Sequence, residues 1–303
     1  MGRRSSRFWF VAGIMIWIVD SMFPCYSQFS GRGEDWNSGS RILNGDPADI
    51  ADYPFYGLIA NSRKIFLNQT AKTGINVHCG SALVSPWYFL TAFHCFMNNI
   101  DPHSWVVIMG LKDRCKEVGD AKLFRITKII PYPKVVVAYK IKKHDIAMFR
   151  VDRPVENINP ISLPTAPPNP GDLGIVIGFG LVRIGSAKGS TDDLACPLQK
   201  VTQLIPNQVL CKSPKEEIVG AFCVTDADKK NAAACRGDSG GPWITNRNGN
   251  LTVTGVSSFG DTLCKVSEHS DHYTNVFLYI TWIQDVVRSW AKKKKATKLK
   301  SHH

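Results

Sequence analysis

Short apolar runs separated by turn residues recur along most of the chain, and they constrain the fold more than any other feature. Each run has the length of a strand and is rich in valine, isoleucine and phenylalanine. Six of them are GSALVSPWYFLTA (80–92), SWVVIMG (104–110), KLFRITKIIPYP (122–133), DIAMFRV (145–151), GIVIGFG (174–180) and LTVTGVSSFG (251–260). Only residues 276–291 have a persuasive helical period. The sequence therefore predicts an all-β domain that ends in one helix.

The first 27 residues have the layout of a secretory signal peptide. An arginine-rich start precedes an apolar stretch at 8–19, and small or compact residues follow at Cys25 and Ser27. We expect cleavage after Ser27 and a secreted, extracellular protein. A retained membrane anchor is the less favoured alternative, because the apolar stretch is short and Asp20 ends it.

The cysteine count agrees with an oxidising compartment. The chain has nine cysteines, and Cys25 would leave with the signal peptide. The remaining eight form an even number, as expected where cysteines pair in disulfides. Two N-x-T sequons, at Asn68 and Asn250, are compatible with glycosylation on surface loops.

Basic residues exceed acidic ones, which gives a formal net charge of +12. Part of this charge lies in the lysine-rich segment 292–303, which follows an amphipathic stretch at 281–290. A lysine run of this kind is usually a solvated, mobile tail. The alternative is weak binding of heparin-like glycans or anionic surfaces, which salt should abolish.

The stretch ACRGDSGGPW at 234–243 has the composition of a nucleophile loop. Its three glycines suggest a tight, accessible turn around Ser239. A serine hydroxyl is a poor nucleophile at neutral pH unless a histidine base is present with a carboxylate that orients it. His94, which an apolar strand reaches within LTAFHCF (90–96), and Asp145, which precedes an alternating strand, are the candidates for these two groups.

At these residues the sequence resembles the chymotrypsin-like serine proteases, which have the trypsin fold. TAFHC matches the T-A-A-H-C of that family, HDIAMFR its D-I-A-L, and CRGDSGGP its G-D-S-G-G-P. The similarity extends from RILNG (41–45) to the C-terminal helix. The resemblance implies two six-stranded antiparallel β-barrels with the active site between them.

The resemblance also implies a role for each member of the triad. Ser239 would attack the scissile carbonyl, and His94 would take the serine proton and pass it to the leaving amine. Asp145 would fix the imidazole tautomer. The backbone N–H groups of Gly237 and Ser239 would form the oxyanion hole.

By the same resemblance, the chain is made as a zymogen. Cleavage after Arg41 by a trypsin-like protease would free the α-amino group of Ile42, which would pair with Asp238 inside the protein. A buried charge without its partner is costly, so the uncut precursor should hold the oxyanion loop in an inactive form.

These expectations divide the chain into four parts. They are a signal peptide (1–27), an activation propeptide (28–41), a trypsin-like serine protease domain (42–291) and a basic C-terminal tail (292–303).

The resemblance suggests three disulfides, and the two cysteines that remain would form a fourth by elimination. The family pairs are Cys79 with Cys95, Cys211 with Cys223, and Cys235 with Cys264; the remaining pair is Cys115 with Cys196.

The resemblance places four residues in the substrate pocket: Ala233 and Asp271 at its base, Ser258 on one wall and Gly260 at its entrance. Ala233 stands where trypsin-like enzymes have aspartate, so an apolar pocket that favours Phe, Tyr, Leu or Met is one reading. If the Asp271 carboxylate reaches into the pocket, Lys or Arg would be accepted too. We favour chymotrypsin-like or mixed specificity over strict trypsin-like cleavage.

Two classes of function compete. The first is a serine endopeptidase that acts on proteins or peptides, needs no metal or cofactor, meets protein inhibitors and is a monomer. The second is a protease-like binding protein that has lost catalysis. The first is favoured because all three triad residues are present.

Overall fold

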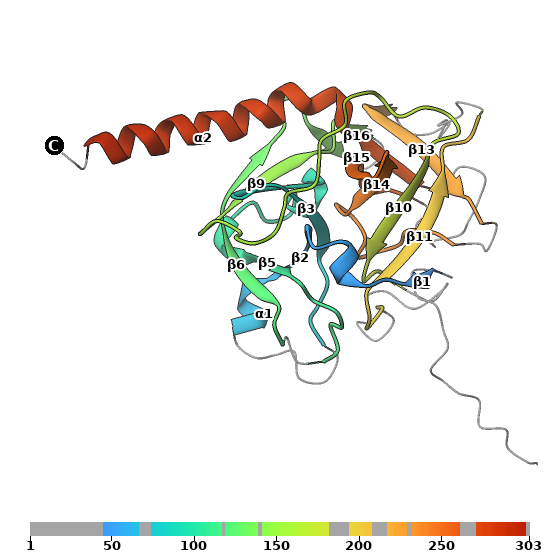
Figure 1. The fold of residues 1–303 in the computed structure, drawn as a ribbon, viewed down its shortest axis with the longest axis horizontal. Helices are drawn as coiled ribbons and strands as arrows, with labels where there is room; N and C mark the ends of the chain where they lie inside the picture. Colours follow the sequence, from blue (N-terminus) through green and yellow to red (C-terminus); the bar gives the residue numbers. More distant parts are fainter. Residues whose placement is uncertain are drawn as a thin grey trace, which may run out of the picture. The chain divides into compact units, whose positions relative to one another are not determined.

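The computed structural model describes residues 45–66, 74–116, 119–138, 141–181, 194–207, 217–228, 232–260 and 271–300, all within the unit Gly39–His303 (Figure 1). Several predictions fall outside these ranges, namely the signal peptide, the propeptide, Arg41, Ile42, Asn68, Cys211 and Cys264.

Six antiparallel strands close into a first barrel, called barrel 1 here. In pairing order they are β2 (Tyr56–Asn61), β3 (Cys79–Ser85), β4 (Tyr88–Thr91), β9 (Ala147–Val151), β6 (Lys122–Pro131) and β5 (Trp105–Met109), which returns to β2. All five residues of β5 are buried. This explains why its sequence is a continuous apolar run and does not alternate.

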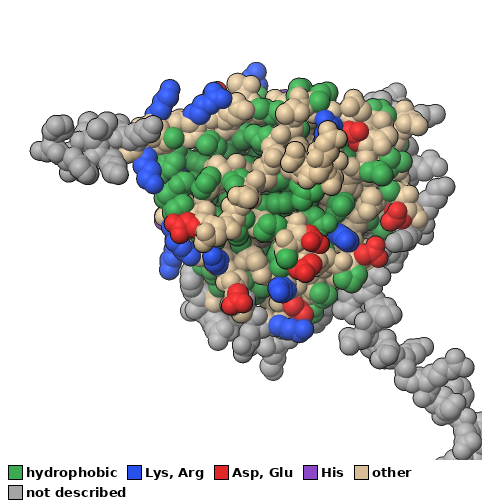
Figure 2. All heavy atoms as spheres, viewed as in Figure 1, with side chains coloured by type: hydrophobic (Ala, Val, Ile, Leu, Met, Phe, Trp, Pro, Cys, Tyr) green, Lys and Arg blue, Asp and Glu red, His purple; other side chains and the backbone are tan. Residues whose placement is uncertain are grey.

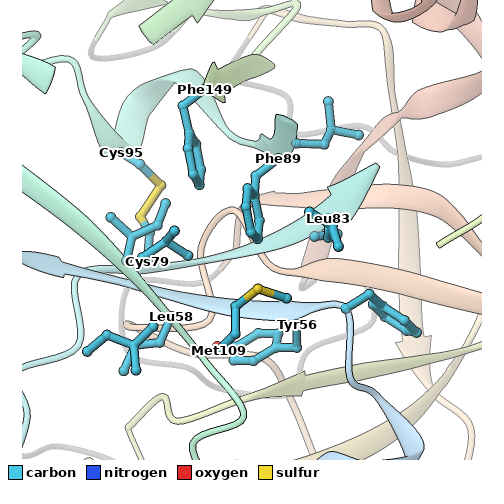
Figure 3. Packing of buried hydrophobic residues seen from close by; sticks show 14 of the residues in the cluster. Tyr56, Leu58, Cys79, Leu83, Phe89, Cys95, Met109 and Phe149 are labelled. Atoms are coloured by element: carbon cyan, nitrogen blue, oxygen red, sulfur yellow. A yellow bond between two sulfur atoms is a disulfide. The ribbon is translucent and has the colours of Figure 1, made fainter. Parts of the chain in front are cut away.

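The interior of barrel 1 is filled by large side chains (Figure 3). The rings of Phe89 and Phe149 stack with their centroids 5.0 Å apart, and Phe96 meets Phe149 edge-on at 6.0 Å. All three side chains have no exposed surface. Packing of this kind fixes β4 against β9, the two strands that lead to His94 and away from Asp145.

A second set of six antiparallel strands forms barrel 2. In pairing order they are β10 (Leu173–Gly178), β14 (Pro242–Arg247), β15 (Asn250–Phe259), β16 (Asp271–Asn275), β13 (Ala221–Asp226) and β11 (Gln199–Leu204), which returns to β10. The short strand β1 (Asp46–Pro47) pairs with β11 from outside. Phe222, Trp243 and Tyr273 fill the interior, with the first two rings 5.1 Å apart.

The remaining elements are short, apart from the C-terminal helix. A three-stranded sheet contains β7 (Val136–Ala138), β8 (Ile141–Lys143) and β12 (Glu217–Val219), with β8 and β12 parallel. The short helices are η1 (Ile50–Asp52), α1 (Ser62–Phe66), η2 (Phe93–Cys95), η3 (Pro102–Ser104) and η5 (Val276–Tyr279). The long helix is α2 (Ile280–Lys300).

Helix α2 is longer than the period at 276–291 predicts, because it continues through lysines expected to form a solvated tail. Its sequence has no glycine or proline from Ile280 to Lys300, and alanine and lysine are strong helix formers. Two cation–ring contacts accompany the helix: Arg150 lies 4.2 Å from the ring of Trp290, and Lys294 lies 4.5 Å from the ring of Trp87. These contacts favour helix through part of the basic segment.

The two six-stranded antiparallel barrels and the C-terminal helix confirm the predicted fold class. No helix in the described ranges is long and apolar enough to span a membrane.

Truncation of Phe149 tests the packing of barrel 1. We expect Phe149→Ala to lower the free energy of unfolding by about 3–5 kcal/mol, because it removes a buried ring and leaves a cavity. Urea unfolding followed by tryptophan fluorescence measures this change. Leu278→Ala is the control, since Leu278 is 59% exposed, and an equal loss in both variants would contradict the assignment of Phe149 to the core.

Candidate active site

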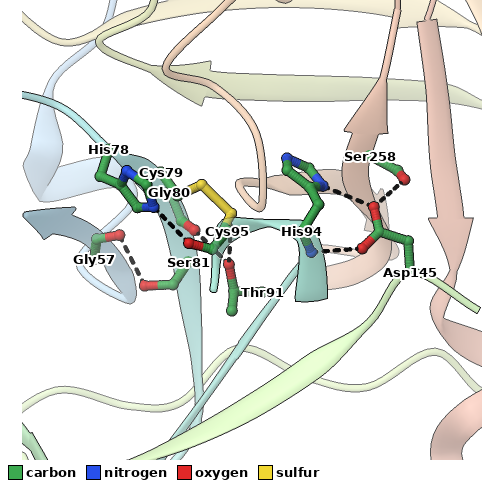
Figure 4. The surroundings of a disulfide bond; sticks show 10 residues. All are labelled: Gly57, His78, Cys79, Gly80, Ser81, Thr91, His94, Cys95, Asp145 and Ser258. Carbon is green, nitrogen blue, oxygen red and sulfur yellow. Dashed lines mark hydrogen bonds and ion pairs between the residues drawn. A yellow bond between two sulfur atoms is a disulfide. The ribbon is translucent and has the colours of Figure 1, made fainter. Parts of the chain in front are cut away.

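His94 lies in η2, directly after β4, and its neighbour Cys95 is bonded to Cys79 on β3. Its backbone N–H donates to Asp145 Oδ1 over 2.9 Å, and its ring Nδ1 lies 2.7 Å from Asp145 Oδ2 (Figure 4). An ionised carboxylate only accepts, so Nδ1 carries the proton. The other ring nitrogen, Nε2, is then left as an acceptor on a side chain that is 22% exposed.

Asp145 is 2% exposed and is held by both barrels. Besides the two bonds from His94, Ser258 Oγ on β15 donates to Asp145 Oδ2 over 2.5 Å (Figure 4). Thr274 Oγ1 on β16 donates to the Asp145 backbone carbonyl over 2.8 Å. Burial alone would raise the pKa of Asp145, but His94 and the hydrogen bonds from His94 and Ser258 lower it below its ordinary value. The carboxylate therefore stays ionised at neutral pH.

The loop that contains Ser239 is fixed at the same junction. The Gly80 N–H donates to the Ser239 carbonyl and the Gly240 N–H donates to the Ser257 carbonyl, both over 2.7 Å. A Cβ on Gly240 would lie 3.1 Å from Cys95 Sγ, so the loop lies against the disulfide beside His94. Across the described ranges, the Ser239 hydroxyl forms no hydrogen bond with His94. Such bonds are often long without substrate and tighten in the reacting complex.

The backbone conformation and the close packing at position 237 explain why this position of the loop is glycine. Its φ of 102° lies in a region that residues with a side chain rarely adopt. A Cβ there would also lie 3.0 Å from Gly180 Cα. The backbone before Ser239 therefore needs glycine both for its conformation and for its close approach to Gly180.

Asp238 points away from the surface and has no exposed area. Its carboxylate accepts N–H bonds from Gly180 and Cys235, both over 2.9 Å. A Cβ on Gly178 or Gly180 would lie within 2.2 Å of a carboxylate oxygen, which explains both glycines. Burial raises the pKa of Asp238 to about 7, despite the two N–H donors. Burial and the Asp238 charge together also raise the pKa of Tyr56.

Of the four predicted pocket residues, the structure gives detailed contacts for Asp271. It is 5% exposed and its Oδ2 accepts bonds from Gln203 Nε2 over 2.6 Å and from the Ala234 N–H over 3.1 Å. Tyr273 in turn donates its hydroxyl to Gln203 Oε1 over 2.8 Å. Ala233 is adjacent to Ala234 and is 1% exposed. The carboxylate that the sequence left with two possible directions thus has partners inside barrel 2.

Two residues of the site were missed or incompletely described by sequence reasoning. Gln203 was not singled out, although it occupies an inward position of β11, where buried and partly buried residues alternate. Ser258 was placed only in the substrate strand, whereas its hydroxyl also binds Asp145. The strand β11 reads QKVTQL and is mostly polar, so its sequence carried no clear signal that Gln203 is buried.

Two of the predicted disulfides have both cysteines in the described ranges, and both are present in the structure. Cys79 is bonded to Cys95 and Cys115 to Cys196. Cys223 and Cys235 are also disulfide-bonded, and their predicted partners lie outside the described residues.

Potential metal ligands come together in two groups within the described ranges, Cys79 with His94 and Cys95, and Asp113 with Cys115 and Cys196. All four cysteines are in disulfides. Cysteine binds a metal as the thiolate, so in this oxidised state neither group offers its sulfur atoms to a metal.

Two antiparallel six-stranded barrels, with a histidine–aspartate pair and a glycine-bounded serine where they meet, define the class of two-barrel serine endopeptidases. The family model described as Trypsin matches residues 42–283. The chain therefore belongs to the trypsin family and is a serine endopeptidase.

Individual relatives agree with this family. Kallikrein-15 of Homo sapiens is 29% identical over 225 residues, which cover 70% of this chain and 82% of the relative. The snake venom serine protease pallabin-2 of Gloydius halys is 28% identical over 264 residues, 82% of this chain and 88% of the relative. The thrombin-like enzyme calobin-1 of Gloydius ussuriensis is 28% identical, with the same coverage.

The raised pKa of Asp238 predicts an unusual pH dependence for the intact chain. Its carboxyl has an ordinary pKa of 3.8 and a folded value of about 7. Between these values the folded state keeps a proton that the unfolded state has released, so the contribution of Asp238 to stability falls as pH rises. We expect Asp238→Asn to remove this part of the fall, measured by urea unfolding at several pH values from 4 to 7. The exposed control Asp152→Asn should keep it; an unchanged slope in Asp238→Asn would contradict the assignment.

Proposed function

We propose that this serine endopeptidase is a secreted enzyme, made as a zymogen, which hydrolyses peptide bonds through Ser239, His94 and Asp145. The observation that carries the proposal is the bond from His94 Nδ1 to the buried Asp145 carboxylate, which leaves Nε2 as the acceptor for a hydroxyl proton. The orientation by a buried carboxylate is what a general base for serine requires.

The reaction proceeds in two halves. His94 Nε2 takes the Ser239 proton while Oγ attacks the scissile carbonyl, and the oxyanion receives N–H bonds from Gly237 and Ser239. His94 then gives the proton to the leaving amine, and the C–N bond breaks to leave an acyl-enzyme. Water, deprotonated by His94, attacks the ester in the same way. The Ser239 oxygen regains its proton as the acid product leaves.

Activation follows cleavage between Arg41 and Ile42 by a trypsin-like protease. The new α-amino group of Ile42 pairs with Asp238 and orders the Ser239 loop. The buried carboxylate with its raised pKa supports this step, because an ammonium partner would offset the cost of burying the charge. Release of residues 1–27 and 28–41 leaves residues 42–291 as the protease domain, followed by the basic segment 292–303.

The preference for the residue before the scissile bond is chymotrypsin-like or mixed. Gln203 and the Ala234 N–H both bind Asp271 Oδ2, so part of its charge is balanced before any substrate enters. Ala233 at the other base position is apolar. Trypsin-like cleavage through Asp271 is the alternative.

Cleavage of a diverse peptide library tests both the triad and the specificity. After cleavage at Arg41, we expect the enzyme to cut after aromatic, leucine or methionine residues and to react with a fluorophosphonate at Ser239. Ser239→Ala should remove labelling and reduce the rate by several orders of magnitude, since the oxyanion hole alone retains little catalysis. Arg41→Gln should remain inactive under the same treatment.

The other outcomes of this experiment are equally informative. Strong cleavage after Lys or Arg would support the Asp271 alternative. Activity indistinguishable from that of Ser239→Ala, in protein whose new Ile42 terminus is verified, would favour a non-catalytic binding protein. Full activity of uncut Arg41→Gln would refute the zymogen.

Two surface features also belong to the proposal. Asn250 is exposed at the start of β15, which suits glycosylation at that sequon. In this proposal the enzyme is a monomer, and protein inhibitors bind where its substrates bind.

The basic end of α2 binds heparin-like glycans weakly in this proposal. Lys292 and Lys294 are exposed, and Figure 2 shows lysine or arginine side chains over α2. Removal of residues 292–303 should lower the salt concentration needed to elute the protein from heparin resin, because fewer cations contact the polyanion. An unchanged elution position would contradict this proposal.

A further inference from the structure

Arg114 is a buried arginine outside the triad and the pocket, 1% exposed, in the segment that follows β5. Its guanidinium donates to three backbone carbonyls in two other segments. Nε bonds to the Ala195 carbonyl and Nη2 to the Leu194 carbonyl, both over 2.8 Å, and Nη1 bonds to the Ile75 carbonyl over 3.3 Å. A guanidinium is expensive to bury unless its donors are used. Arg114 therefore fixes the carbonyls that it binds.

A continuous series of hydrogen bonds connects Arg114 to the Ser239 loop. The Ala195 N–H donates to the Gly180 carbonyl over 3.0 Å. The Gly180 N–H then donates to Asp238 Oδ1 over 2.9 Å, and Asp238 stands between Gly237 and Ser239. The Leu194–Ala195 peptide group accepts from Arg114 Nη2 and donates to the Gly180 carbonyl. The carbonyl and the N–H of Gly180 belong to the two adjacent peptide groups joined at its Cα, so a displacement of residues 194 and 195 is passed to Asp238 through this one residue.

Side-chain packing makes a second connection between the same segments. Leu194, whose carbonyl binds Arg114, has its Cδ2 atom 3.3 Å from the position of a Cβ on Gly237. Val77 Cγ1 lies at the same distance. Leu194 therefore packs on the backbone that precedes Ser239.

The backbone of Arg114 is itself fixed. Its N–H donates to the Cys196 carbonyl and its carbonyl accepts from the Ile75 N–H, both over 2.8 Å. The next residue, Cys115, is bonded covalently to Cys196. The guanidinium thus projects from a fixed backbone, in the segment after β5 of barrel 1, to the segment that leads into β11 of barrel 2.

We propose that Arg114 is a positioning residue for the oxyanion hole. Acting through Ala195, Gly180 and Asp238, it supports the Ser239 loop, so that after cleavage at Arg41 the Gly237 N–H is aimed at the developing oxyanion. This role rests on the proposed hydrolytic function of Ser239. The planar fork of arginine reaches two adjacent carbonyls at once, which lysine cannot do.

The test compares Arg114→Lys and Arg114→Met with wild-type enzyme, each cleaved after Arg41. We expect kcat to fall by about tenfold or more with KM within about twofold, because misplaced donors weaken the transition state more than the bound substrate. Affinity for a peptide aldehyde, which forms a tetrahedral adduct on Ser239, should fall in parallel with kcat. Arg114→Lys retains the buried cation and decides the question if Arg114→Met does not fold.

The alkaline limit of kcat/KM gives an independent measurement. The free α-amino group of Ile42 has an ordinary pKa of about 8, and pairing with Asp238 raises it. A less ordered loop pairs more weakly, so the amine loses its proton at lower pH. The limit should therefore shift to lower pH in both variants.

Thr245→Val is the matched control for lost stability, because it breaks a buried bond to Thr254 within barrel 2 without touching the series. If the Arg114 variants lose thermal stability as this control does but keep wild-type kcat and an unshifted alkaline limit, the proposal is wrong. An inactive wild-type enzyme would instead overturn the function of Ser239.

Discussion

The junction of the two barrels depends on the hydrogen bonds of the buried Asp145 carboxylate. Asp145 accepts bonds from His94 in barrel 1 and from Ser258 in barrel 2, and its backbone carbonyl accepts from Thr274. A carboxylate without these donors would be costly to bury, and His94 without the carboxylate would lack a fixed tautomer. This group therefore connects the two barrels beside a buried apolar cluster that also spans them, since Ile177, Ile244 and Val256 of barrel 2 belong to the same cluster as the core of barrel 1.

A second buried carboxylate has the opposite balance. Asp145 has enough donors to lower its pKa, whereas Asp238 has two N–H donors and a pKa raised to about 7. Asp145 is therefore stable as an anion in the intact chain, whereas ionised Asp238 would be stabilised by a nearby cation. The burial of Asp238 also explains the local sequence, because Gly178 and Gly180 leave the space that the Asp238 carboxylate occupies.

The sequence predicted the two barrels, because strand-length apolar runs encode them locally, and its motifs singled out His94 and Asp145, which the structure brings together. It also predicted the two disulfides whose cysteines are both described, one from a family motif and one by elimination. The helix α2 extends to Lys300, beyond the predicted end at 291, because alanine and lysine there are strong helix formers that add nothing to a hydrophobic period. Contacts between distant residues were not predictable. Gln203 binds Asp271 across 68 positions, and Arg114 binds Ala195 across 81. The positions of polar residues along a single sequence do not specify which of them will form hydrogen bonds once the two barrels have closed.

The bond between Cys115 and Cys196 closes a covalent ring of the chain, with a separation of 81 residues, and this ring includes β6, β9 and β10. Hydrolysis of any single peptide bond inside the ring opens it without producing two separate molecules. A protease is continually exposed to its own activity and to that of its neighbours. A single cut between Cys115 and Cys196 therefore breaks the backbone, but the disulfide keeps the two fragments joined. The fragments can diffuse apart only after a reductant has cleaved this bond.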